Sequence, residues 1–201
     1  MQLFAFGVVK GVVLMRKNPV FDMAVCGIMT AMFCLSAVFA VPMPMTPVPV
    51  TLQTFFVCVF AALLKRRQSV TVIFAYLLLG IAGLPVFSGM RSGVGVLAGP
   101  TGGFLLGFIP AAYTISTLFR VLYGARKLPP VLSLAIPFVA GGLVIYTFGT
   151  AQLMVVNSLS PQAAFVAGAL PFIAIDFAKI TVAVLTILPF YGKISVIRSD
   201  L

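Results

Sequence analysis

The chain contains no glutamate, no histidine and no tryptophan, and aspartate occurs at only three of its 201 positions. Without histidine there is no Ser/His/Asp set for acyl transfer. The three aspartates, Asp22, Asp176 and Asp200, form no acidic cluster of the kind that holds Mg²⁺. The Gly-x-x-x-x-Gly-Lys-Ser/Thr motif of nucleotide-binding loops is also missing. These absences argue against a hydrolase or a metal-dependent transferase, and no cofactor is expected.

Charged residues are scarce as well. They make up 8% of the chain, whereas 62% of the residues are hydrophobic and the mean hydropathy is +1.21. A soluble domain needs roughly a quarter of its residues charged, so this sequence cannot build a water-soluble surface. The length fits one membrane domain. The net charge of +10 is therefore interpreted as setting orientation in a lipid bilayer, not as a nucleic-acid-binding surface.

Long apolar runs predict an all-α integral membrane protein, because a bilayer core needs about 20 apolar residues per helix. Six helices are expected in the single domain 1–201, the second and third of them short: 21–41, 49–64, 69–84, 100–123, 130–151 and 171–190. The stretch 1–13 is too short to span and is interpreted as an interfacial helix or a start-site ambiguity. Cysteine occurs only inside apolar runs and is expected as buried free thiols: Cys26, Cys34 and Cys58.

Basic residues alternate between the predicted loops. The loops after the first, third and fifth helices carry only Arg91. The other loops and the two ends carry nearly all the remaining positive charge: Lys10, Arg16, Lys17, Lys65, Arg66, Arg67, Arg120, Arg126, Lys127, Lys193 and Arg198. Since Lys and Arg concentrate in cytoplasmic loops, we predict six crossings of the cell membrane with both termini in the cytoplasm.

Asp176 and Lys179 lie inside the sixth predicted helix, where the i, i+3 spacing puts them on one face. A lone charge at the bilayer centre costs at least about 2.5–3.5 kcal/mol, and such residues mark substrate paths. At 1.5 Å per residue from a start at Pro171, they lie about 7–8 Å and about 12 Å along the helix. They are therefore expected in the outer half, open to an external pocket. An ion pair that only supports packing is the alternative.

The second, fourth and sixth predicted helices start at the outer face, each with proline- or glycine-rich sequence: 47–54, 99–104 and 168–171. Free N–H groups and the positive dipole end of a helix favour an anion. Three such starts on one face predict a binding site, although each alone also fits an ordinary helix start. Uncharged polar residues expected in this layer are Thr51, Gln53, Thr101 and Ser88.

The predicted outer loop 84–97 holds Arg91, whose guanidinium fork suits a carboxylate. A solvated loop residue is the alternative for Arg91. In the first predicted helix, Ala24, Gly27 and Ala31 form a stripe of small residues, which allows close approach of another helix in lipid. The sequence leaves open whether that helix belongs to a partner protein or to this chain.

Four motifs, in this order along the chain, carry a family resemblance: Pro-Val-Pro-Val-Thr-Leu-Gln-Thr (47–54), Gly-Leu-Pro-Val-Phe (83–87), Gly-Pro-Thr-Gly-Gly-Phe-Leu-Leu-Gly (99–107) and Leu-Pro-Phe…Asp…Lys (170–179). The chain resembles the BioY family, the biotin-specific S components of energy-coupling-factor transporters, over roughly residues 20–192. The resemblance implies an outward-facing pocket for one biotin. It also implies partnership with a transmembrane T component and a pair of ATPases, contacted in part through the first helix.

The resemblance further implies that Asp176 and Lys179 contact biotin, together with groups from the loop before residue 100. Biotin carries a ureido ring with N–H donors and a carbonyl, an apolar thioether ring and a valerate carboxylate. Asp176 suits the N–H donors, whereas Lys179, Arg91 and the helix starts suit the carbonyl or the carboxylate. Aromatic side chains expected to wall the ring are Phe55, Phe87 and Phe104. The sequence leaves open which end of biotin lies deepest.

The leading hypothesis is a non-catalytic, biotin-binding membrane subunit that works with an ATPase module. The alternative is a solitary secondary transporter, coupled to a proton or ion gradient through Asp176. A membrane enzyme acting on a lipid or cofactor is a third class, disfavoured because the chain lacks a catalytic set of residues.

Overall fold

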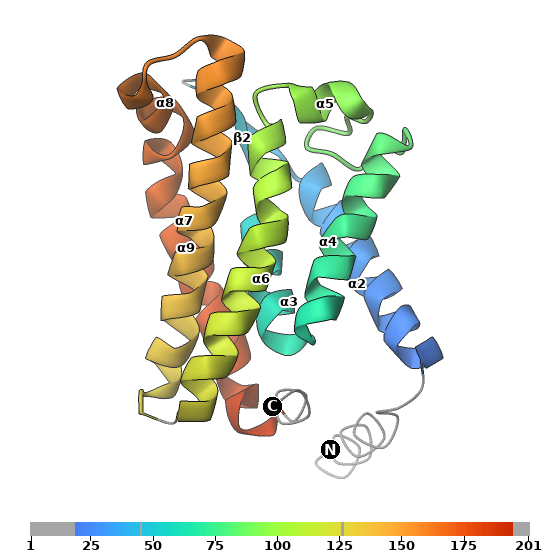
Figure 1. Cartoon of the computed structure of the whole chain (residues 1–201), viewed down its shortest axis with the longest axis vertical. Helices are drawn as coiled ribbons and strands as arrows, with labels where there is room; N and C mark the ends of the chain where they lie inside the picture. The colour runs from blue at the N-terminus through green and yellow to red at the C-terminus, as the bar shows by residue number, and fades with distance from the viewer. Residues whose placement is uncertain (1–18, 45, 126, 195–201) are drawn as a thin grey trace.

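The computed structural model describes residues 19–44, 46–125 and 127–194, so the predicted interfacial stretch 1–13 lies outside the described residues. Within them, helices of eleven or more residues alternate in direction along one bundle (Figure 1): α2 (Pro19–Val38), α3 (Gln53–Leu63), α4 (Arg66–Ile81), α6 (Gly102–Ala125), α7 (Pro130–Asn157) and α9 (Leu170–Ile187). Shorter elements lie at the two ends of the bundle: β1 (Val41–Met43), β2 (Thr46–Val50), α5 (Val94–Ala98), α8 (Pro161–Gly168) and the 3₁₀ helix η1 (Leu188–Lys193).

Four helical stretches are long and apolar enough to cross a bilayer: Pro19–Val38, Gly102–Ala125, Pro130–Asn157 and Leu170–Lys193. The chain is therefore a mainly helical, multi-pass membrane protein. The helices α3 and α4 have only 11 and 16 residues. Six membrane crossings, and the cytoplasmic location of both termini, therefore remain predictions.

Prolines account for two of the errors in the predicted helix bounds. The second helix begins at Gln53 and not at 49, because Thr46–Val50 is a β-strand paired antiparallel with Val41–Met43. A residue that precedes proline avoids the helical region, and proline has no N–H to give a helix. Pro47 and Pro49 thus keep this segment extended, and Pro42 does the same to Val41, so that α2 ends at Val38.

Glycines let α6 and α7 pack closely together. A Cβ atom on Gly103 would collide with the backbone oxygen of Phe148, and one on Gly149 would collide with the ring of Phe104. Small residues at a helix contact are the usual means of close approach in a membrane, where lipid removes the hydrophobic drive for helix association. The contact therefore determines where the Phe104 ring lies.

The charge pattern grouped Arg120 with the basic residues of the loops. In the structure, Arg120 lies buried within α6. Its Nη2 donates to the backbone oxygen of Leu64, 3.0 Å away, and its Nη1 donates to the Ser116 hydroxyl at 2.8 Å. Leu64 directly follows α3, at the helix end where backbone carbonyls lack helical partners. A positive side chain is favourable at such an end. Arg120 therefore fastens the end of α3 to α6.

The topology prediction is tested with single cysteines, in a parent whose Cys26, Cys34 and Cys58 are replaced by alanine. Gln162 on α8 and Arg67 on α4 are both exposed, and α8 and the start of α4 lie at opposite ends of the bundle (Figure 1). In intact cells, Gln162→Cys should react with a membrane-impermeant thiol reagent. Arg67→Cys should react only after permeabilisation, because the basic end of α4 is predicted to face the cytoplasm. Labelling of Arg67→Cys in intact cells would overturn the orientation.

Candidate ligand-binding site

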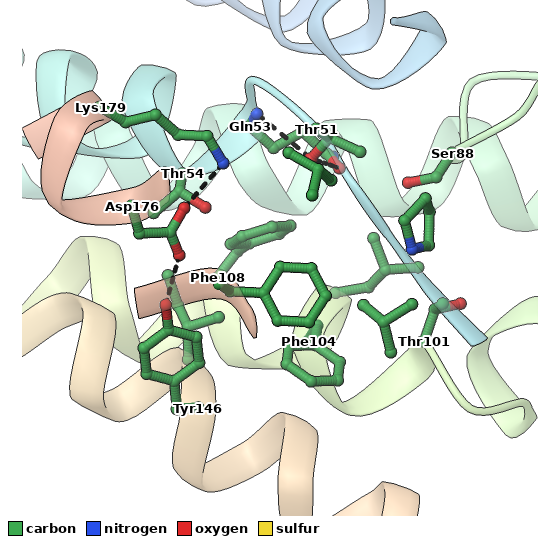
Figure 2. Close-up of a pocket in the computed structure, with 16 residues that line it drawn as sticks. Thr51, Gln53, Thr54, Ser88, Thr101, Phe104, Phe108, Tyr146, Asp176 and Lys179 are labelled. Atoms are coloured by element: carbon green, nitrogen blue, oxygen red, sulfur yellow. Dashed lines mark hydrogen bonds and ion pairs between the residues drawn. The ribbon is translucent and has the colours of Figure 1, made fainter. Parts of the chain in front are cut away.

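A pocket lies where β2 meets the first turns of α3 and α6, and the sides of α7 and α9 close it (Figure 2). It is an open hollow with about 510 Å³ of space not filled by protein atoms, part of which is open to solvent. We call it the main pocket. Its lining residues are Val48, Pro49, Val50, Thr51, Gln53, Thr54, Ser88, Thr101, Phe104, Leu105, Phe108, Ile145, Tyr146, Phe172, Asp176 and Lys179.

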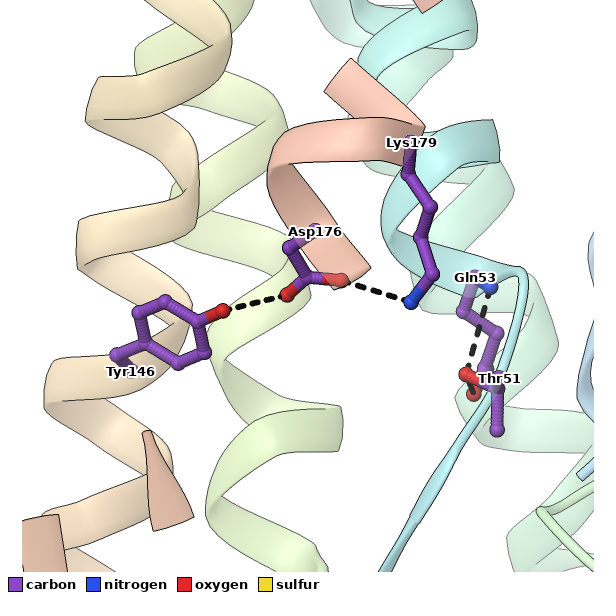
Figure 3. Close-up of polar contacts among 5 residues, drawn as sticks. All are labelled: Thr51, Gln53, Tyr146, Asp176 and Lys179. Atoms are coloured by element: carbon purple, nitrogen blue, oxygen red, sulfur yellow. Dashed lines mark hydrogen bonds and ion pairs between the residues drawn. The ribbon is translucent and has the colours of Figure 1, made fainter. Parts of the chain in front are cut away.

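A charged cluster of three residues lies at one side of this pocket (Figure 3). The Nζ of Lys179 donates to Asp176 Oδ1 at 2.7 Å, and the hydroxyl of Tyr146 donates to Asp176 Oδ2 at 2.6 Å. The side chains of Lys179 and Asp176 are only 11% and 13% exposed. Hydrogen bonds to an ionised group are shorter and stronger than those between neutral groups. Each oxygen of the carboxylate therefore has one strong donor.

The local sequence explains why this cluster faces the pocket. Pro171 occupies the first turn of α9, where its missing N–H costs nothing. From the start of the helix at Leu170, Asp176 lies about 9 Å and Lys179 about 13–14 Å along the axis, at 1.5 Å per residue. The i, i+3 spacing puts both on one face, as the sequence predicted, and that face also carries Phe172 into the pocket.

The predicted polar residues Thr51 and Gln53 line the pocket but are already engaged with the protein. The Nε2 of Gln53 donates to the Tyr76 hydroxyl at 2.9 Å, and the Thr51 hydroxyl donates to Gln53 Oε1 at 3.1 Å. Gln53 is only 1% exposed. These bonds hold the turn between β2 and α3 against α4. Thr101 and Ser88, also predicted, line the same pocket.

Two of the three predicted aromatic walls lie outside the main pocket. Phe104 lines it, and Phe108 and Phe172 join it there. Phe87, by contrast, is fully buried and packs edge-on against Tyr76, with 5.5 Å between ring centroids. The loop after α4 folds back on the helix, where the Gly93 N–H donates to the oxygen of Gly80, and this fold carries the Phe87 ring onto Gly80.

Phe55 is the second predicted aromatic residue that lies outside the main pocket. It does not line the main pocket but packs against Phe56, with 5.2 Å between ring centroids. The sequence predicted it as an aromatic wall residue, but α3 turns successive side chains to different faces. Gln53 and Thr54 line the pocket, whereas the Phe55 side chain points to another face of α3.

Arg91 is exposed and lies beside the main pocket, not in it. Its Nε donates to the backbone oxygen of Ser88 at 3.1 Å. It borders a second hollow, which we call the hairpin hollow: Ala40, Pro42, Met43, Thr46, Pro47, Pro49, Ser88, Gly89 and Arg91. Pro49 and Ser88 line both hollows, so Arg91 is close to the rim of the main pocket.

A third hollow, the lateral groove, lies between α7, α8 and α9 with about 1020 Å³ of empty space. Most of its lining is apolar: Thr54, Val139, Gly142, Leu143, Tyr146, Thr147, Thr150, Phe165, Ala169, Ile173, Asp176, Phe177 and Ile180. Tyr146, Asp176 and Thr54 line both this groove and the main pocket. These three side chains therefore form the wall between the two hollows.

The sequence prediction missed two residues that organise the site. Tyr146 lies in the predicted helix 130–151, and a tyrosine at membrane depth needs a hydrogen-bond partner for its hydroxyl. The sequence thus signals a polar neighbour, which the structure shows to be Asp176. Gln152 donates from Nε2 to the backbone oxygens of Leu97 and Gly99, at 2.6 and 2.8 Å. It thereby holds the end of α5 against α7, next to Thr101.

The small-residue stripe of α2 is exposed at all three positions, Ala24, Gly27 and Ala31. A Cβ atom added to Gly27 would meet nothing within 4 Å. The stripe therefore makes no close helix contact within the described part of the chain, which removes the internal-packing alternative there.

Comparison with known proteins places this geometry in a family. The family model described as "BioY family" matches residues 11–194. "Biotin transporter BioY" of Thermotoga maritima is 38% identical over 160 residues, covering 79% of this chain and 89% of that protein. "Biotin transporter BioY2" of Lactococcus lactis is 34% identical over 166 residues, covering 82% and 87%.

The fold is similar to the crystal structure of the S-component for biotin from an ECF-type ABC transporter. The TM-score is 0.77 and the sequence identity 22%, with 84% of this chain and 89% of that chain covered. This likeness extends over the helical bundle that holds the main pocket, and the family match extends over nearly the whole sequence. The chain belongs to the BioY family.

Proposed function

We propose that this protein takes up biotin across the cell membrane, as the non-catalytic, biotin-binding S component of an energy-coupling-factor transporter. The observation that carries the proposal is the Asp176–Lys179–Tyr146 cluster facing a pocket with phenylalanine walls. Relatives with 34–38% identity are named biotin transporters, and the similar fold is that of an S component for biotin.

The cluster is chemically suited to the ureido group of biotin. An ionised carboxylate only accepts hydrogen bonds, and each Asp176 oxygen has lone-pair capacity beyond the one bond it receives. The ammonium of Lys179 has three N–H donors, of which Asp176 takes one. A ureido N–H would thus donate to Asp176 while the neighbouring ureido carbonyl accepts from Lys179.

The remaining groups of the pocket orient the rest of the molecule. The thioether ring would pack on Phe104 and Phe108, which bury apolar surface. The valerate carboxylate would be repelled by Asp176 at short range. It would extend past Ser88 and Pro49 to the hairpin hollow, where Arg91 offers a planar pair of donors. Biotin would therefore bind with its ureido ring at the cluster and its carboxylate at the rim.

The proposed partners are a transmembrane T component and a pair of ATPases, with the lipid bilayer around the bundle. The exposed stripe Ala24, Gly27 and Ala31 on α2 is the proposed contact for the T component, because small residues allow close helix approach in lipid. A solitary secondary transporter is the competing function. Uptake of labelled biotin in a host with and without the ATPases separates the two, since uptake unimpaired by the deletion contradicts the S-component proposal.

The first test of the site uses Asp176→Asn and Lys179→Met. A hydrogen bond to a charged group contributes about 1.5–3 kcal/mol, which corresponds to a ten- to more than hundredfold change in affinity. Each variant should bind biotin at least about tenfold more weakly than the parent. Calorimetric titration of the purified protein in detergent measures the dissociation constant.

The double variant distinguishes binding from packing. If the pair only supported the fold, removing both charges would be tolerated better than removing one, since one removal leaves a buried charge uncompensated. In the proposed site the double variant stays as weak as the single ones. Recovery of parental affinity in the double variant would show that the pair is structural. Lys193→Met, at an exposed position on η1, is the matched control and should bind like the parent.

The second test addresses the α2 stripe with Gly27→Leu and Ala31→Leu. Neither new side chain meets a crowded interior, because both positions are exposed. Biotin binding by the isolated protein should stay within about twofold of the parent, while uptake in cells with the complete transporter falls, since a bulky residue prevents close helix approach. Val155→Leu, 80% exposed on α7, is the control for added bulk. Unchanged uptake in both stripe variants would exclude this surface as the contact.

A further inference from the structure

The two hydrogen bonds on Asp176 differ in what they can fix. Lys179 is on the same helix as Asp176, three residues away, and its ammonium is carried on a flexible four-carbon stem. This pair moves with α9 as a unit. Lys179 neutralises the negative charge of the carboxylate but does not fix the orientation of the carboxylate relative to the other walls of the pocket.

Tyr146 reaches the carboxylate from a different helix (Figure 3). Its hydroxyl lies 2.6 Å from Oδ2, on a rigid ring with few rotatable bonds. Its helix, α7, is held closely against α6 through the contacts of Gly103 and Gly149. Since α6 carries Phe104, the bond from Tyr146 connects the acceptor group of the pocket with its aromatic wall.

The lateral groove shows what the carboxylate would do without this bond. Asp176 lines both the main pocket and the groove, and so does Tyr146. With only Lys179 attached, rotation about the Asp176 side chain would direct Oδ2 toward either hollow. The Tyr146 bond removes that freedom before the ligand arrives, and a preorganised group binds more tightly than one that must be ordered on binding.

We infer that Tyr146 is a positioning residue for ligand binding: its hydroxyl holds the Asp176 carboxylate in the orientation that accepts the N–H donors of the ligand. This inference rests on the proposed function of the main pocket. Tyr146 acts through Asp176 and contributes no charge of its own.

The test is Tyr146→Phe, which removes one oxygen and keeps the ring that separates the two hollows. Biotin should bind about ten- to a hundredfold more weakly, the change expected on loss of a hydrogen bond to a charged group. Faster dissociation should account for most of the loss, as for most changes within one binding site. Calorimetry gives the affinity, and release of labelled biotin gives the rate.

The matched control is Thr150→Val, one turn further along α7. Its hydroxyl donates within its own helix, to the backbone oxygens of Tyr146 at 2.6 Å and Thr147 at 3.5 Å. Both variants should melt within a few degrees of the parent without ligand. The rise in melting temperature on adding biotin should shrink for Tyr146→Phe alone, because that rise follows the affinity. Equal weakening in both variants would mean that α7 was merely loosened, and would overturn the inference.

Asp176→Asn, measured in the same series, separates the positioning role of Tyr146 from the proposed binding of biotin in the main pocket. If Asp176→Asn binds weakly and Tyr146→Phe binds like the parent, the positioning role is wrong and the proposed site stands. If neither variant loses affinity, the proposed site itself fails. The expected result is weak binding in both.

Discussion

The constraint on which the site depends is the cost of keeping a carboxylate away from water. Asp176 is 13% exposed on a helix long and apolar enough to cross a bilayer. A charge in that position needs compensation by an opposite charge and by hydrogen bonds, or it destabilises the fold. Lys179 provides the charge and Tyr146 the second hydrogen bond. In the proposed site, the lone pairs that these two residues leave free on the carboxylate accept hydrogen bonds from the ligand.

The scaffold around this cluster follows from that requirement. Glycines bring α6 and α7 together, so that Tyr146 on α7 and Phe104 on α6 share one wall. Prolines keep Thr46–Val50 extended, and this strand closes the opposite side of the pocket at the start of α3. The pocket therefore combines a fixed polar end, an apolar middle and a rim near Arg91, in the order in which biotin presents its ureido ring, thioether ring and carboxylate.

Short-range spacing made part of this site predictable. Asp176 and Lys179 share a helix, so their i, i+3 separation was enough to place them on one face. Contacts between helices were harder to predict. The sequence does not say that Tyr146 lies beside Asp176, 30 positions away. Phe87 was predicted from the sequence to form an aromatic wall of the pocket, yet the loop after α4 packs its ring onto Gly80. The alternation of basic loops predicted six crossings and cytoplasmic termini, which stay predictions, while Arg120, which was grouped with those loops, proved to be a buried anchor for α3.

A structure of the protein with biotin bound tests the central claim most directly. The account predicts a ureido nitrogen within hydrogen-bond distance of Asp176, the ureido oxygen within reach of the Lys179 ammonium, and the Tyr146 hydroxyl still bonded to Asp176. The carboxylate of biotin should lie toward Arg91. A biotin carboxylate paired with Lys179, with the ureido ring at the rim, would contradict the account.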